Sequence, residues 1–148
     1  MSKTVILIPS RLSATRLPGK PLLKINGVSI ISHVVKKAKE ADIGDVYVAT
    51  EDKEILDDVN LNKGKAILTS NKHKTGSDRI FECFEKLDLK NIDYIINLQG
   101  DEPNIDVNDL KHLNQLVDMN KPEIGTLGSE IKDKNSLNNE NIVKVITE

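Results

Sequence analysis

Short apolar runs alternate with amphipathic helical patterns along this chain, and that alternation constrains the fold more than any other feature. Strand-like runs occur at residues 4–8, 46–50, 66–68 and 94–98, and helical patterns lie between most of them. Strands that alternate with helices form βαβ units, which give a mostly parallel sheet with helices on both faces. The sequence therefore predicts an α/β fold, a three-layer sandwich of the Rossmann-like type.

The helical patterns have recognisable starts. Ser29 is placed to cap a helix that ends at residue 40, and a short helix is predicted around residues 52–61. A third helix is predicted to begin at Ser77, whose hydroxyl can cap it, and to bury Phe81 among its apolar residues. Asp106 is placed to cap a fourth helix over residues 107–119.

The end of the chain has a different pattern. The apolar runs at residues 124–131 and 142–146 predict two further strands of uncertain direction, joined by an Asn-rich polar connection. The chain stops just after the second run, which suggests that a natural continuation is missing.

Length and composition limit the class of protein. The 148 residues suit one domain, and a net charge of -2 with 3% aromatic residues argues against a nucleic-acid partner. The chain has no apolar stretch near the roughly 20 residues that span a bilayer, and it has no signal-peptide pattern, so a cytoplasmic protein without membrane insertion is predicted. The single cysteine, Cys83, lies among apolar helix positions and is interpreted as a core thiol.

A basic loop follows the first predicted strand. Residues 9–21 contain Arg11, Arg16 and Lys20, separated by small and turn-forming residues. Guanidinium groups form bidentate contacts with phosphate oxygens, and a lysine adds a mobile positive charge. The loop therefore predicts a polyphosphate site, with a solvated basic loop as the alternative.

Two more polar segments follow predicted strands. In residues 97–103, Asp101 follows a buried strand and is placed to bind a divalent metal, although a carboxylate that caps a local turn is the alternative. In residues 72–79, a glycine-containing loop enters a helix, where backbone amides can bind a base, ribose or phosphate. Arg79 could turn toward this site or could pair with Asp78 at the surface, and His73 is interpreted as a loop hydrogen-bonding residue.

Two common phosphate motifs are absent from the sequence. The chain has no Gly-Lys-Ser/Thr segment of the P-loop type, and no Gly-x-Gly-x-x-Gly follows the first strand. The chemistry that remains for a cationic loop opposite a metal-binding carboxylate is nucleotidyl transfer. In that reaction an acceptor oxygen attacks the α-phosphorus of a nucleoside triphosphate and pyrophosphate departs.

Taken together, residues 8–22, 25–27, 73–79 and 97–103 resemble the 3-deoxy-manno-octulosonate cytidylyltransferases, or CMP-Kdo synthetases. The resemblance implies the nucleotide-diphospho-sugar transferase fold, CTP and Kdo as substrates, Mg2+ as cofactor, and CMP-Kdo for lipopolysaccharide synthesis as product. It assigns catalytic roles to Arg11, Arg16, Lys20 and Asp101, with Asp101 as metal ligand. The implied nucleotide-binding residues are Pro9, Arg11, Arg16, Lys20, Ser77, Arg79 and Gln99. Ser10 departs from the family pattern, in which alanine is more usual.

The resemblance also implies a longer protein. Residues 1–148 would be a single nucleotide-binding domain without the C-terminal portion that completes the sugar site and the dimer interface, and the complete protein would be a homodimer. Two alternatives stay open: a cytidylyltransferase for another acidic or amino sugar, and a nucleotide-binding module without turnover.

Overall fold

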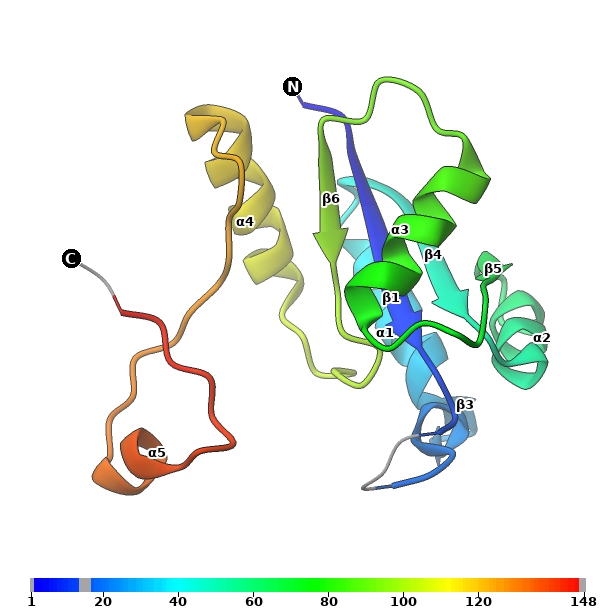
Figure 1. The fold of residues 1–148 in the computed structure, drawn as a ribbon, viewed down its shortest axis with the longest axis horizontal. Helices are drawn as coiled ribbons and strands as arrows, with labels where there is room; N and C mark the ends of the chain where they lie inside the picture. Colours follow the sequence, from blue (N-terminus) through cyan, green and yellow to red (C-terminus); the bar gives the residue numbers. More distant parts are fainter. Residues whose placement is uncertain (1, 14–16, 147–148) are drawn as a thin grey trace.

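A parallel four-stranded sheet forms the centre of the molecule (Figure 1). The computed structural model describes residues 2–13 and 17–146. The sheet has the order β5-β4-β1-β6, and all of its pairings are parallel. Its strands are β1 (Thr4–Ser10), β4 (Gly44–Thr50), β5 (Ala66–Leu68) and β6 (Tyr94–Asn97). The predicted α/β class with a mostly parallel sheet is confirmed.

Helices cover both faces of this sheet. Three of them, α1 (Ile30–Glu40), α2 (Lys53–Leu61) and α4 (Val107–Asn120), contribute to the same core cluster. The helix α3 (Gly76–Leu87) lies on the opposite face, in front of the sheet in Figure 1. The result is the predicted three-layer arrangement.

Alternation along the central strand β1 produces two separate cores. Ile6 and Ile8 pack toward α1 and α2, whereas Val5 and Leu7 pack toward α3. A strand with both faces covered is apolar at successive positions, which explains the unbroken apolar run in the sequence. Cys83 of α3 is fully buried in the second core, and burial raises the pKa of its thiol to about 11. It is therefore an inert core residue, as expected.

The predicted helix starts are mostly confirmed, with one correction. The Ser29 hydroxyl accepts a hydrogen bond from the Ser32 amide, and Asp106 caps α4. For α3 the cap is Thr75, whose hydroxyl accepts from the amide of Asp78 at 3.1 Å, and Ser77 lies inside the first turn. Thr75 has the extended backbone that an N-cap requires, so the prediction of Ser77 as the cap is wrong.

Two side chains lie differently from the sequence expectation. Phe81 is 62% exposed because the neighbouring Ile80 occupies the position of α3 that faces the sheet. Asp58, a charged helix residue of the kind that ordinarily faces solvent, accepts hydrogen bonds from the hydroxyls of Ser29 and Ser32. It thereby joins α2 to the first turn of α1.

A small hairpin links the basic loop to α1. The 3-10 helix η1 (Lys20–Leu22) leads into β2 (Lys24–Ile25) and β3 (Val28–Ser29), which pair antiparallel. Asn26 and Gly27 between them have φ angles of 50° and 81°, values typical of a two-residue hairpin turn. The hairpin sets the point at which α1 begins.

The last part of the chain differs from the sequence prediction. The strands expected at residues 124–131 and 142–146 are not formed, and the described part of this region contains only the short helix α5 (Lys134–Asn138). Ile124, Val143 and Ile146 are 88%, 91% and 94% exposed. A strand needs a neighbour for its backbone hydrogen bonds, and within the described residues neither run pairs with one. Figure 1 shows this segment running away from the sheet.

Candidate nucleotide site

The order of the strands defines where a ligand site is expected. From β1 the chain proceeds outward to β4 and then to β5, and it returns as β6 on the other side of β1. In open parallel sheets, ligands bind beyond the carboxyl ends of the strands at such a reversal of strand order. The loops that follow β1 and β6 are therefore the ones expected to form a site.

These two loops meet through a salt bridge. Lys20, at the end of the basic loop, lies with its Nζ 2.8 Å from Oδ2 of Asp101, which follows β6. The two side chains are 35% and 55% exposed. An exposed ion pair of this kind contributes only about 0–1 kcal/mol, so a charged ligand can replace it at little cost.

Pro9 is the point at which three of the sequence motifs converge. A Cβ atom added to Gly76, in the segment that enters α3, would lie 3.2 Å from Cγ of Pro9. A Cβ atom added to Gly100, next to Asp101, would lie 2.9 Å from the carbonyl oxygen of Pro9. Both contacts are tight, so the absence of a side chain at these glycines allows the loops to approach β1.

The basic loop itself is anchored at both ends. The amide of Leu12 donates to Oδ2 of Asp52 at 2.7 Å, and the amide of Gly19 donates to the carbonyl of Leu12 at 3.0 Å. Gly19 has a φ of 73°, which favours glycine. Arg11 is exposed beside this closed loop, whereas Arg16 lies outside the described residues. Sequence reasoning assigned no role to Asp52, although its position directly after β4 was a usable signal.

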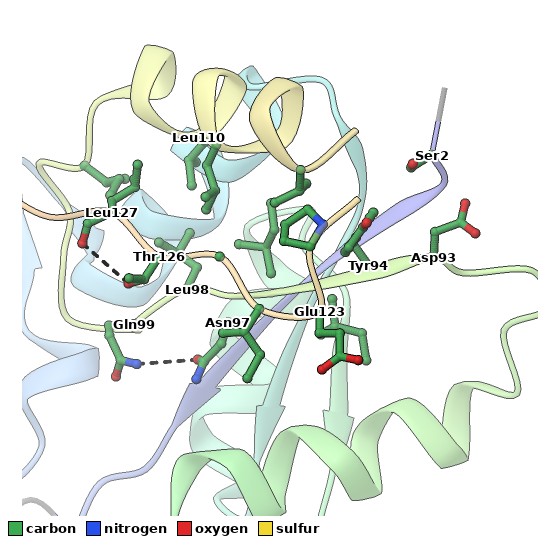
Figure 2. A pocket seen from close by; sticks show the side chains of 18 of the residues that line it. Ser2, Asp93, Tyr94, Asn97, Leu98, Gln99, Leu110, Glu123, Thr126 and Leu127 are labelled. Atoms are coloured by element: carbon green, nitrogen blue, oxygen red, sulfur yellow. Dashed lines mark hydrogen bonds between the residues drawn. The ribbon is translucent and has the colours of Figure 1, made fainter. Parts of the chain in front are cut away.

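Two other predicted nucleotide contacts, Ser77 and Gln99, lie at the surface near this edge of the sheet. Ser77 is exposed in the first turn of α3, and Gln99 is exposed after β6, where its amide donates to Oδ1 of Asn97 at 3.4 Å. Figure 2 shows Gln99 and Asn97 turned toward each other at the margin of a hollow between β6, α4 and residues 121–127. This hollow has a volume of about 1210 Å³, and of the predicted site residues Gln99 is the one found among its described lining residues.

Arg79 lies elsewhere than the sequence suggested. Its side chain is 3% exposed, pairs with Glu51 after β4, and donates to the hydroxyl of Thr69 at 2.7 Å and to the carbonyl of Ser70 at 3.3 Å. A buried guanidinium requires such partners because desolvation of its charge is costly. The alternative of a surface pairing with Asp78 is wrong, since Arg79 lies on the buried face of α3 and pairs with Glu51. With its nitrogen atoms so engaged, the guanidinium faces the protein interior.

The segment that precedes α3 is held by a second charged residue. Glu82 accepts hydrogen bonds from the Ser70 amide at 2.9 Å, from the Nε2 atom of His73, and from Nζ of Lys86 at 2.7 Å. Lys86 first, and then the Ser70 amide and His73, lower the pKa of Glu82 to about 2. His73 is therefore a loop hydrogen-bonding residue, as expected.

A metal ion at this edge would have few protein ligands. Within residues 2–13 and 17–146, the structure has no group of three or more His, Cys, Asp or Glu side chains that could hold one. Asp101 is an exposed carboxylate beside the cationic loop. Mg2+ commonly binds through one or two carboxylates together with substrate phosphates and water, so Asp101 fits a metal that arrives with a nucleotide.

The parallel α/β fold, with charged loops at its strand-order reversal, places the chain among α/β proteins whose ligand site lies at the carboxyl edge of the sheet. A model of the family described as "Cytidylyltransferase" matches residues 5–148. The chain therefore belongs to the cytidylyltransferase family.

Curated relatives and solved structures narrow the comparison. The 3-deoxy-manno-octulosonate cytidylyltransferase of Nitrobacter winogradskyi is 44% identical over 146 residues, which cover 98% of this chain and 58% of the relative. The enzyme of the same name from Thermodesulfovibrio yellowstonii is also 44% identical, covering 97% and 58%. This chain thus spans a little more than half the length of these relatives.

A solved structure of CMP:2-keto-3-deoxy-manno-octonic acid synthetase complexed with CTP matches with a TM-score of 0.75 and 44% identity, over 81% of this chain and 49% of that one. A cytidylyltransferase from Leptospira borgpetersenii matches with a TM-score of 0.69 and 28% identity, over 82% of this chain and 51% of that one.

Among the helices of the described part of the chain, none is both long and apolar enough to cross a membrane.

Proposed function

We propose that this chain is the nucleotide-binding part of an enzyme that transfers a cytidylyl group from CTP to Kdo, forming CMP-Kdo and releasing pyrophosphate. The observation that carries the proposal is the contact between Lys20 and Asp101, which joins two separate motifs at the strand-order reversal. Membership of the cytidylyltransferase family and 44% identity to enzymes with this name support the choice of nucleotide and sugar.

The proposed site works by exchanging partners. Lys20 would leave Asp101 for a phosphate oxygen, and Asp101 would become a ligand of the Mg2+ that accompanies the triphosphate. Each charge keeps an opposite partner throughout, so the exchange avoids leaving an unpaired charge near the protein. Mg2+ would supply neutralisation of the negative charge on the triphosphate.

The reaction then requires orientation and charge stabilisation. A hydroxyl oxygen of the acceptor forms a bond to the α-phosphorus and gives up its proton to water or to the departing pyrophosphate. The bond between that phosphorus and the bridging oxygen breaks, and pyrophosphate leaves with the electron pair. Arg11 and Lys20, with Arg16, would bind the departing pyrophosphate, while Ser77, Gln99 and the backbone near Pro9 would orient the nucleotide. Catalysis of this kind depends on positioning and on electrostatic stabilisation.

The remaining parts of the proposal concern the complete protein. A role in lipopolysaccharide synthesis belongs to it, supported by the name shared by the relatives. A cytoplasmic location and a homodimer also belong to the proposal, as properties that the sequence resemblance implies. The chain spans 58% of the Nitrobacter relative, so the portion beyond Glu148 would supply the rest of the sugar site.

Pyrophosphate release tests the proposal, measured with CTP, Mg2+ and Kdo on this chain and on a version extended to the length of the relatives. Release that depends on all three components, at least in the extended version, is expected. Arg16→Ala should weaken CTP binding in both versions. Activity only with another acidic or amino sugar would replace Kdo in the proposal, and CTP binding without turnover in the extended version would identify a binding module.

A further inference from the structure

Two oppositely charged side chains on α3 bind the two peptide groups that flank a single residue, Ser70. Arg79 donates to the carbonyl oxygen of Ser70 at 3.3 Å, and Glu82, almost one turn further along α3, accepts from its amide at 2.9 Å. Ser70 follows Thr69 at the carboxyl end of β5, in the segment that leads to the N-cap Thr75. The helix therefore holds the segment that precedes it through two hydrogen bonds.

Arg79 also binds the segments that follow β4 and β5. Its other contacts are the hydroxyl of Thr69 at 2.7 Å and the carboxylate of Glu51, directly after β4. The amide of Thr69 in turn donates to the carbonyl of Thr50 at 2.7 Å. The start of segment 69–75 is thus fixed to the ends of both β4 and β5, by a side chain that is 3% exposed.

Glu82 also contacts His73, in the middle of the segment. One of its oxygen atoms accepts from both the Ser70 amide and the His73 ring, while the other is paired with Lys86 at 2.7 Å. The hydroxyl of Ser70 accepts from the Lys72 amide at 3.1 Å, which closes a turn between these two contacts. The segment is therefore held at its first two residues and again at His73.

We infer that Arg79 and Glu82 are positioning residues that hold segment 69–75 in the conformation in which it serves the nucleotide site, an inference that rests on the function proposed above. The segment leads into Gly76, where an added Cβ atom would lie 3.2 Å from Cγ of Pro9, the residue where the other two motifs also meet. A loop fixed before the ligand arrives does not have to be ordered during binding, which improves affinity. Arg79 would act through this segment and not by contact with the nucleotide.

The test compares Glu82→Gln with Glu85→Gln, a matched control at an exposed position of the same helix. Amide hydrogen exchange is measured at Ser70 and His73, and CTP affinity is measured with Mg2+ by calorimetry. In Glu82→Gln the exchange at Ser70 should accelerate about 10-fold and CTP should bind several-fold more weakly, because a charged acceptor is lost. The melting temperature of each variant reports whether an effect is global. Glu85→Gln should leave exchange and affinity unchanged.

Arg79→Lys provides a second arm, because lysine keeps the charge but cannot make the forked contacts to Thr69, Ser70 and Glu51. It should also weaken CTP binding. Equal exchange at Ser70 in Glu82→Gln and Glu85→Gln would overturn the inference, as would faster exchange with unchanged CTP affinity. Failure of the unmodified chain to bind CTP would contradict the proposed function instead, and the exchange data would still decide whether the two side chains order the segment.

Discussion

Two ion pairs at the same edge of the sheet differ in how far they are exposed to water. Lys20 and Asp101 are 35% and 55% exposed, whereas Arg79 and Glu51 are 3% and 14% exposed. The first pair joins the segments that follow β1 and β6, and the second joins α3 to the segment that follows β4. The exposed pair is weak and exchangeable, while the buried pair is costly to break because a single charge would remain without a partner. Exposure therefore separates a contact suited to ligand binding from one suited to holding the fold.

The largest effect is expected from breaking the buried pair. Arg79→Ala should lower the free energy of unfolding by about 3 kcal/mol, because the carboxylate of Glu51, which is 14% exposed, would be left largely desolvated without its charged partner. Urea denaturation measures this change. Arg11→Ala, at an exposed position, should change it by less than about 0.5 kcal/mol. Similar losses in both variants would contradict the high cost assigned to breaking the Arg79–Glu51 pair.

The exposed pair should show the reverse pattern. Asp101→Asn should change the unfolding free energy by less than about 1 kcal/mol, yet weaken CTP binding in the presence of Mg2+ by about 10-fold, since a charged ligand group is lost. Without Mg2+ the variant should bind CTP at least as well as the unmodified chain, because Lys20 is released. Titration calorimetry with and without Mg2+ measures both values. Asp57→Asn, exposed on α2, serves as the control, and equal losses in the two variants would refute the role of Asp101.

Ser10 extends the comparison to a buried polar group that carries no charge. Its hydroxyl is buried at the end of β1, and no hydrogen-bond partner for it lies among the described residues. Ser10→Ala should therefore raise the unfolding free energy by about 1 kcal/mol, since a buried unsatisfied hydroxyl is removed. Thermal and urea denaturation would reveal the gain. A loss of stability would mean that the hydroxyl is satisfied in the folded protein.

Glu82, of intermediate exposure, predicts an effect that is seen only on acidification. Its pKa is lowered to about 2, so its ionised form stabilises the fold above the ordinary glutamate pKa, and this contribution is lost as the pH falls toward 2. The unfolding free energy should therefore fall more steeply between about pH 5 and pH 2 in the unmodified chain than in Glu82→Gln. Denaturation across this range checks the difference. Parallel curves would contradict the lowered pKa.

The sequence predicted the sheet and its helices because the signals were local. Both faces of β1 are buried, which made its apolar run unbroken, and Ser29 and Asp106 cap their helices through contacts within three residues. The hairpin at Asn26 and Gly27 was missed, although that dipeptide is a strong hairpin signal. The two C-terminal strands were wrongly predicted because strand formation depends on a neighbour that the local pattern does not reveal.

The sequence predicted which charged residues would meet at the site, but it did not predict all of their partners. The loops that carry Lys20 and Asp101 were expected to face each other because both follow strands of one parallel sheet. The partners of Arg79 were not foreseen, because Glu51 lies 28 residues away in the sequence and their meeting depends on how α3 packs. Ser77, Gln99 and Pro9 remain predictions as nucleotide contacts.

A structure determined with CTP and Mg2+ tests the central claim most directly. The account predicts that Lys20 leaves Asp101, that its Nζ lies within hydrogen-bonding distance of a phosphate oxygen, and that a carboxylate oxygen of Asp101 binds the metal. A bound nucleotide that leaves the contact between Lys20 and Asp101 intact, with its phosphates at another edge of the sheet, would contradict it.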